Sequence, residues 1–267
     1  MKNDTYDFND GNGPVPAHRH ENPDGSAGGW VADTATVDDT ALIGENARVS
    51  GNAKVLENAQ VYENAWVWGN ARVSGNAKVS ENAQVYAYAK VFDNADVSGN
   101  AWVCGNAQVL DNAQVYTYAK VFDNAEVSGN AWVCGNAQVC ENAKVSGKAR
   151  AGKNARVYEN AWVFDTADVC GNAQVYGNAK VFGDAEVSRN AKVLENAQVS
   201  ENAWVFGDAK VCGDAKVSGN ARVYENAWVF GDAEVSGKAK VFGDAKVCGD
   251  ADVSGNARVD GDKTVTN

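Results

Sequence analysis

The chain has 267 residues, of which 45% are hydrophobic, and a formal net charge of −11 at pH 7. This acidic balance disfavours electrostatic attraction to nucleic acid or to an anionic membrane surface. No apolar run approaches the roughly 20 residues that a membrane-spanning helix needs, and the polar start Met1-Lys2-Asn3-Asp4 lacks the pattern of a signal peptide. We therefore expect a cytoplasmic protein with neither nucleic acid nor a membrane as partner.

Residues 1–30 differ in kind from the rest of the chain. They hold all three prolines and both histidines, His18 and His20, and they show neither the period of a strand nor that of a helix. The sequence predicts an irregular N-terminal arm that becomes ordered only against a partner. The two histidines are candidate metal ligands, with Glu21 or Asp24 as a third. The preferred interpretation is a polar surface segment or an oligomer contact, with no metal and no cofactor.

Residues 31–267 form a six-residue repeat. A valine returns at every sixth position, and the residues behind it nearly always end in Asn-Ala or Asp-Ala, as in Val49-Ser50-Gly51-Asn52-Ala53. Only Ile43 and Ala151 stand where valine is expected. Such a period predicts a solenoid whose core grows coil by coil.

Each six-residue unit is expected to contain one short strand and one corner. Gly-Asn and Glu-Asn pairs recur at a fixed offset behind the valine, and Asn and Gly both accept the positive φ angle of tight turns. The alanine after the corner is small enough to fit where the chain bends back inward. The residues on either side of the valine should point outward, because neighbours in a strand face opposite ways.

This pattern resembles that of the hexapeptide-repeat proteins, in which a small residue follows an aliphatic one four places later. The resemblance covers residues 31–265 and implies an all-β, left-handed parallel β-helix: a triangular solenoid with about 18 residues per coil and about 13 coils. The lead-in Gly28-Gly29-Trp30-Val31 is similar to that of a group of bacterial and prophage-encoded hexapeptide proteins. This similarity implies a bacterial or phage-infected cell, with the virion as the alternative location, and carries over no catalytic residues.

A coil of 18 residues divides the valines among three walls. The first wall contains Val49, the second Val37 and the third Ile43, each continued in steps of 18 residues. Large exposed apolar patches usually mark interactions, so aromatic residues beside the valines of the first wall are the candidate protein contact. The alternative is that aromatic residues suit strands and stack on neighbours one coil away. We call this set the first-wall aromatics: Trp66, Trp68, Tyr86, Trp102, Phe122, Tyr158, Tyr176, Trp228 and Phe230.

All six cysteines directly follow a valine and should therefore point outward. Two cysteines on one wall, such as Cys104 and Cys140, lie two coils apart, or about 9.6 Å at the usual strand spacing. A disulfide needs Cα atoms within about 7 Å of each other. The spacing therefore predicts reduced thiols and a reducing compartment.

Three functions remain open. The resemblance includes acyltransferases and γ-class carbonic anhydrases, whose chemistry depends on histidine, but no histidine follows His20. We therefore predict a non-enzymatic structural or interaction scaffold, a solenoid rod that forms a homo-oligomer, assembles end to end or docks another protein. The alternative is an acidic inhibitor or DNA-mimic decoy of a host protein, although lysines such as Lys210 and Lys216 follow the acidic corners closely. A hexapeptide acyltransferase is the third possibility.

Overall fold

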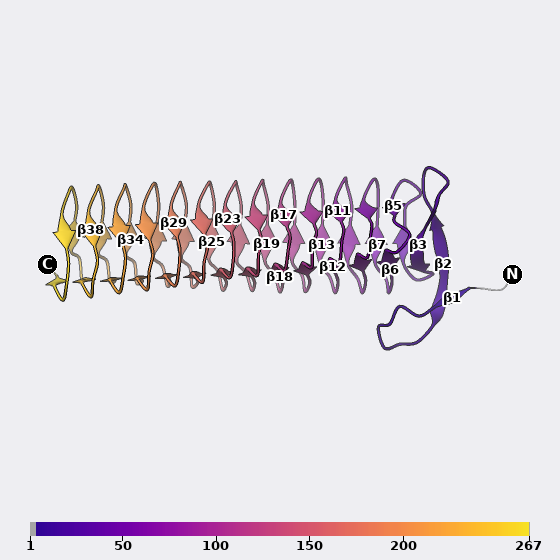
Figure 1. Ribbon diagram of the computed structural model, residues 1–267, viewed down its shortest axis with the longest axis horizontal. Helices are drawn as coiled ribbons and strands as arrows, with labels where there is room; N and C mark the ends of the chain where they lie inside the picture. Colours follow the sequence, from indigo (N-terminus) through magenta and orange to yellow (C-terminus); the bar gives the residue numbers. More distant parts are fainter. Residues whose placement is uncertain (1–3, 267) are drawn as a thin grey trace. The chain divides into compact units, whose positions relative to one another are not determined.

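The computed structural model describes residues 4–266, and within that range it contains β-strands and no helix. The chain divides into two compact units, Met1–Gly129 and Asn130–Asn267. Each unit is a stack of parallel β-coils, which Figure 1 shows as successive short arrows. The predicted all-β solenoid with about 13 coils of about 18 residues is confirmed, whereas the left hand of the coil stays a prediction.

The strands of the repeat follow one rule. From β4 (Thr36–Val37) onward, each strand consists of a valine position and the residue before it. The next strands follow in steps of six residues, so that β6 is Arg48–Val49, β7 is Lys54–Val55 and β42 is Thr264–Val265. The strands are short because a corner follows every valine.

Three walls build each unit. In the first unit the first wall begins with β3 (Ala27–Ala32) and has the strand order β3-β6-β9-β12-β15-β18. In the second unit it has the order β21-β24-β27-β30-β33-β36-β39-β42. The second and third walls advance in the same way, by every third strand. Pairing is parallel, and each residue lies opposite the one 18 places later, as Val49 does with Val67. The three columns predicted from the sequence are therefore the three sheets.

The core is made of two residues from each repeat. Val49 and Ala53 are fully buried, and the same holds for nearly every valine and alanine at these positions. Ile43 and Ala151, which replace valine, are also fully buried. Burying one valine side chain contributes roughly 1.5–3 kcal/mol. The repetition of these small contributions, coil after coil, stabilises an interior that has no large side chains.

The corners differ in one detail from the expectation. The positive φ angle belongs to the residue before the Asn and not to the Asn itself: Gly51 has a φ of 65°, whereas Asn52 is not among the positive-φ residues. The corner closes through a 3.4 Å hydrogen bond from Ala53 N to Ser50 O. Glycine adopts such a positive φ angle at no steric cost. The backbone N–H of Asn52 donates instead to Gly69 O of the next coil, at 2.7 Å.

The corner asparagines are joined by their side chains into ladders. The Nδ2 group of Asn76 donates to Oδ1 of Asn94 at 3.1 Å, and Asn94 donates in turn to Asn112 at 3.2 Å. Stacked amides of this kind stabilise repeating β-structures. The Asn side chain at the corner thus provides a hydrogen bond to the next coil. In the second unit such a ladder runs through Asn136, Asn154, Asn172 and Asn190.

The N-terminal segment is not irregular, and that prediction is wrong for the part that the structure describes. It contains β1 (Thr5–Tyr6), β2 (Val15–Glu21) and β3 (Ala27–Ala32). β2 pairs antiparallel with both β1 and β3, and β3 then begins the first wall (Figure 1). The sequence signal was missed because a bulge between Arg19 and Glu21 breaks the alternation of β2. A small apolar cluster holds the segment together: Phe8, Ala17 and Ala32.

This segment covers the first coil of the third wall. The Nε2 group of the buried His20 lies 3.1 Å from Ala41 O, so this nitrogen carries the proton and donates it. Asn22, also buried, accepts a 2.9 Å hydrogen bond at Oδ1 from the backbone N–H of Ile43, in β5 (Leu42–Ile43). An exposed strand edge is a template for unwanted pairing. Two side chains of the N-terminal segment thus take the place of a missing neighbouring strand.

Candidate functional site

The first-wall aromatics at positions directly after a valine lie against one another along the coil axis. The rings of Trp68 and Tyr86 stack with centroids 4.7 Å apart and an interplanar angle of 8°. Tyr158 and Tyr176 stack in the same way at 4.8 Å. All four side chains are only partly exposed. These rings therefore have partners within the fold, as the stacking alternative expects.

The tryptophans directly before a valine are held by a second contact. In three of them the indole Nε1 donates to the residue 16 places earlier, as Trp66 does to Ser50 Oγ at 3.0 Å. Trp228 makes the same contact with Cys212 Sγ at 3.1 Å. The Lys120 ammonium lies 4.4 Å from the Trp102 ring centroid, within the range of a cation–π interaction.

The other four first-wall aromatics are two tryptophans and two phenylalanines. Trp102 and Trp228 are 39% and 37% exposed, so one face of each ring reaches solvent. Phe122 and Phe230 are partly buried. Trp228 and Phe230 lie 4.7 Å apart. The structure therefore divides the set into short stacks with exposed tryptophans between them.

Sequence reasoning overlooked the aromatic residues of the third wall. Phe206, Tyr224 and Phe242 form a continuous stack with centroid spacings of 5.0 Å. Trp132 and Trp204, on the same wall, are 45% and 42% exposed. The signal was present, because each of these residues also adjoins a valine position. The aromatic residues of the first wall therefore do not distinguish it from the third wall as the candidate protein contact.

Two tyrosines were missed because they occupy corners. Tyr88 and Tyr118 stand at the place of the ladder asparagine, and they are 61% and 55% exposed. They are the most exposed large aromatic side chains of the described chain. Tyr118 lines two hollows in the surface of the first unit, with volumes of 440 and 370 Å³.

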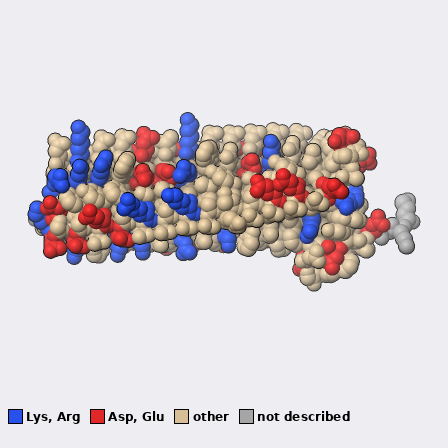
Figure 2. Space-filling model, in the orientation of Figure 1, with Lys and Arg blue, Asp and Glu red and all other residues tan. Residues whose placement is uncertain are grey.

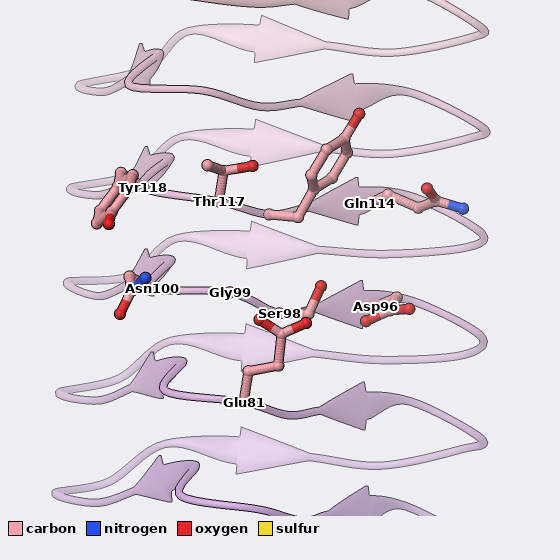
Figure 3. A pocket seen from close by; sticks show the side chains of 9 residues that line it. Glu81, Asp96, Ser98, Gly99, Asn100, Gln114, Thr117 and Tyr118 are labelled. Atoms are coloured by element: carbon pink, nitrogen blue, oxygen red, sulfur yellow. The ribbon is translucent and has the colours of Figure 1, made fainter.

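The larger hollow exists because small residues lie between large ones. Glu81, Gly99 and Thr117 occupy the same corner place in three successive coils, so that Gly99 lies between two larger residues. At the neighbouring place, Ser98 lies one coil before Tyr116. Figure 3 shows Glu81 extending from the coil below towards Ser98 and Gly99. Gly99 cannot easily be replaced, since it has a φ of 70° and a Cβ would lie 2.6 Å from Thr117 N. The hollow is lined by Glu81, Asp96, Ser98, Gly99, Asn100, Gln114, Tyr116, Thr117 and Tyr118.

Asp96 is the most unusual group at this hollow. The side chain is half-buried, and its Oδ1 has no hydrogen-bond partner within the described part of the chain. Burial raises the pKa of Asp96 above its usual value, Lys78 opposes this shift, and Glu81 adds to it. A buried carboxylate is costly unless a cation or a donor compensates it.

Burial disfavours the ionised form of several cysteine and tyrosine side chains on the walls. All six cysteines are thiols. Burial raises the pKa of Cys104, Cys170 and Cys212, so the reactive thiolate is disfavoured at neutral pH. Burial, with a smaller contribution from the hydrogen bond to Cys104, also raises the pKa of Tyr86 to about 12.

The two histidines do not converge on a metal site. His18 is exposed and its Nδ1 lies 2.9 Å from Asp33 Oδ1, whereas His20 is buried against Ala41 O. The bulge in β2 gives them these different surroundings. Across residues 4–266, no three His, Cys, Asp or Glu side chains are grouped so that they could hold a metal ion.

The surface charges of both signs are mixed. Figure 2 shows basic and acidic side chains interspersed over the visible face of each unit. One such pair joins Lys216 Nζ to Glu234 Oε1 at 2.9 Å, and both side chains are more than half exposed. Exposed pairs of this kind contribute little to stability. The described residues include no helix of the length and apolar character that crossing a membrane requires.

Part of the second unit is similar to a known repeat family. Residues 215–231, from β34 (Lys216–Val217) to β36 (Trp228–Val229), match the family model described as "YdcK Beta solenoid repeat". No curated protein matches the chain significantly. Together with the six-residue register, the match supports a β-solenoid of the hexapeptide-repeat type.

Proposed function

We propose that this hexapeptide-repeat β-solenoid is a non-enzymatic scaffold that contacts protein partners, including further copies of itself, through exposed tryptophans on its walls. One observation carries the proposal. Five tryptophans remain more than a third exposed at the position before a valine, although smaller polar residues occupy that position in most coils. Tryptophan is enriched in protein interfaces and in their energetic centres. The five are Trp102, Trp132, Trp162, Trp204 and Trp228.

The geometry prepares these side chains for contact. The Nε1 group of Trp162 donates to Ser146 Oγ at 2.9 Å, and the Arg222 guanidinium lies 4.7 Å from the Trp204 ring centroid. A ring held on one side loses less conformational freedom when a partner covers its other side. These indoles can therefore act as preorganised apolar contacts.

The chemistry of the remaining residues favours a scaffold over an enzyme. His20 uses its Nε2 proton to bind the first coil, and burial raises the pKa of the Cys104, Cys170 and Cys212 thiols. These four side chains, of kinds often used as general base or nucleophile, are thus engaged in the fold or held in their less reactive form.

Light scattering across micromolar concentrations tests self-association. We expect the wild-type mass to exceed that of a monomer, and a variant with all five tryptophans changed to Gln to approach the monomer mass. Gln is compatible with the repeat, because Gln84 and Gln138 occupy the same position. The control is a variant with the first-unit residues Gln84 and Gln108 changed to Lys. A wild-type mass of one chain at every concentration would contradict self-association.

A further inference from the structure

The hollow beside Tyr118 combines two kinds of group that attract organic cations. Asp96 and Glu81 supply carboxylates, and Tyr118 supplies an aromatic ring (Figure 3). A second ring comes from Tyr116, which also lines the hollow. The nine described residues that line it include neither lysine nor arginine. A cation within about 6 Å of an aromatic face is attracted by the ring, most strongly where water is partly excluded.

The Glu81 carboxylate does not make a bond that two of the corner glutamates make. Glu195 and Glu225 each accept a hydrogen bond from the backbone N–H of the next corner glycine, at 2.6 and 2.8 Å. The corresponding bond from Gly99 to Glu81 is not present among the hydrogen bonds of the described residues. Glu81 instead extends into the hollow, where its charge is available to a ligand.

The chain contains a matched position that differs from this one in the charge of the corner residue. Asp168 lies on the same wall four coils later and is also half-buried with a raised pKa. There the Arg150 Nε atom lies 3.6 Å from Asp168 Oδ1. Lys153 occupies the corner place that Glu81 has beside Asp96, and it lowers the pKa of Asp168 whereas Glu81 raises that of Asp96. Both aspartates thus have a basic residue opposite them one coil earlier, Lys78 and Arg150, and the two positions differ in charge at the corner, where the first has an anion and the second a cation.

We propose that the hollow formed by Asp96, Glu81, Tyr116 and Tyr118 binds an alkylammonium group. One carboxylate pairs with the positive nitrogen, the second adds to the negative field, and the tyrosine rings contact the attached carbon atoms. The group is the end of a free amine or the side chain of a lysine on a polypeptide, since both present the same chemistry. The proposal does not depend on the tryptophan-mediated contacts above, because it uses none of those residues.

Binding is tested by NMR titration of the full chain with choline. The control ligand is 3,3-dimethylbutan-1-ol, which has the same shape without the charge. We expect choline to shift the amide signals of Gly99 and Tyr118, and the neutral alcohol to leave them in place. Equal shifts with both ligands, or no shift with choline or cadaverine at millimolar concentration, would overturn the proposal.

Matched variants locate the site. Asp96→Asn and Glu81→Gln should each weaken choline binding by about tenfold, because each removes one attractive charge at close range. Asp168→Asn is the control and should leave binding unchanged. Lys78→Gln should strengthen binding, since it removes a nearby competing cation. Circular dichroism checks that each variant is folded. Equal weakening by Asp168→Asn would show a diffuse effect of net charge and would overturn the assignment.

Two further arms identify the source of the group. Cadaverine represents a free amine, and a short peptide with one lysine represents a protein side chain. Displacement of bound choline by either ligand supports the site. The ligand that binds more tightly shows whether the natural ligand is a free amine or a lysine side chain of a polypeptide. If Mg²⁺ displaces choline at equal concentration, the hollow is an inorganic cation site and the alkylammonium proposal is wrong.

Discussion

The Glu225 carboxylate accepts a 2.8 Å hydrogen bond from the backbone N–H of Gly243, the corner residue one coil later. Glu225 itself has a φ of 60°, a conformation that costs a residue other than Gly roughly 1–2 kcal/mol. A hydrogen bond to a charged acceptor offsets part of this cost. The relationship explains why acidic residues as well as Gly are found at the strained place of the corner.

Glu225→Ala tests this compensation. The backbone can accept the change, since Ala87 has a φ of 58° at the same place in another corner. We expect the free energy of unfolding to fall by about 1 kcal/mol, because Gly243 loses its partner while the strain remains. The measurement is urea denaturation followed by circular dichroism. Glu201→Ala is the control, as no bond from the Glu201 side chain to the next corner occurs among the described residues. Equal losses for the two variants would contradict the role of the bond.

Tyr88→Asn should stabilise the first unit. Tyr88 interrupts a corner ladder between Asn70 and Asn106, and 61% of its surface is already exposed, so little burial is lost on substitution. A new Asn can bond to both neighbours and should raise the free energy of unfolding by about 0.5–1 kcal/mol. Tyr88→Ala removes the same ring without adding an amide. The difference between the two variants in thermal denaturation therefore measures the ladder, and a value near zero would exclude its contribution.

The solenoid could be predicted from the sequence because its determinants are local and repeated. Valine at every sixth position fixes the inward face of each strand, and Gly-Asn or Glu-Asn fixes where each strand ends. The position of the positive φ angle was harder to predict. Both Gly51 and Asn52 tolerate it, and only the bond from Asn52 N to the next coil decides between them. That bond depends on a residue 18 positions away.

The candidate site could be predicted only in part. Outward aromatic positions follow from strand alternation, but the hollow depends on which residues are stacked at intervals of 18. Glu81, Gly99 and Thr117 appear unrelated in the linear sequence, and their side-chain sizes create the hollow only when aligned in one column. The N-terminal segment was missed for another reason. His20 and Asn22 act as substitutes for a strand edge, and no periodic pattern marks such a role.

Asp96 should make stability depend on pH. Its pKa is raised in the folded state, mainly by burial, so folding favours the protonated form. Wild type and Asp96→Asn should therefore be similarly stable below pH 3.8, the ordinary value for Asp. As the pH rises through the folded-state pKa, the wild type should lose stability relative to the variant. Thermal denaturation of both proteins between pH 3 and 8, without an added amine, checks this sign. A difference that shrinks as the pH rises would contradict it.

Asn22→Ala should expose the strand edge that the N-terminal segment covers at the first coil of the third wall. The substitution leaves the Ile43 backbone N–H without the Asn22 acceptor, and a buried donor without a partner costs about 1–3 kcal/mol. We expect faster hydrogen exchange at the Ile43 amide and at neighbouring amides of the first coil, with little change in the second unit. Asn22→Asp retains an acceptor oxygen and should preserve most of the protection.

The same substitution separates a local role from a global one. Repeat proteins are stabilised by contacts between neighbouring coils, so damage at one end should spread only as far as those contacts carry it. If Asn22 acts as the substitute for a strand edge, the loss of protection should decrease with each coil beyond Ile43. The exposed edge should also promote aggregation, since unpaired strand edges recruit other chains. Uniform loss of protection throughout residues 43–129 would instead show that the N-terminal segment is required for the whole first unit to fold.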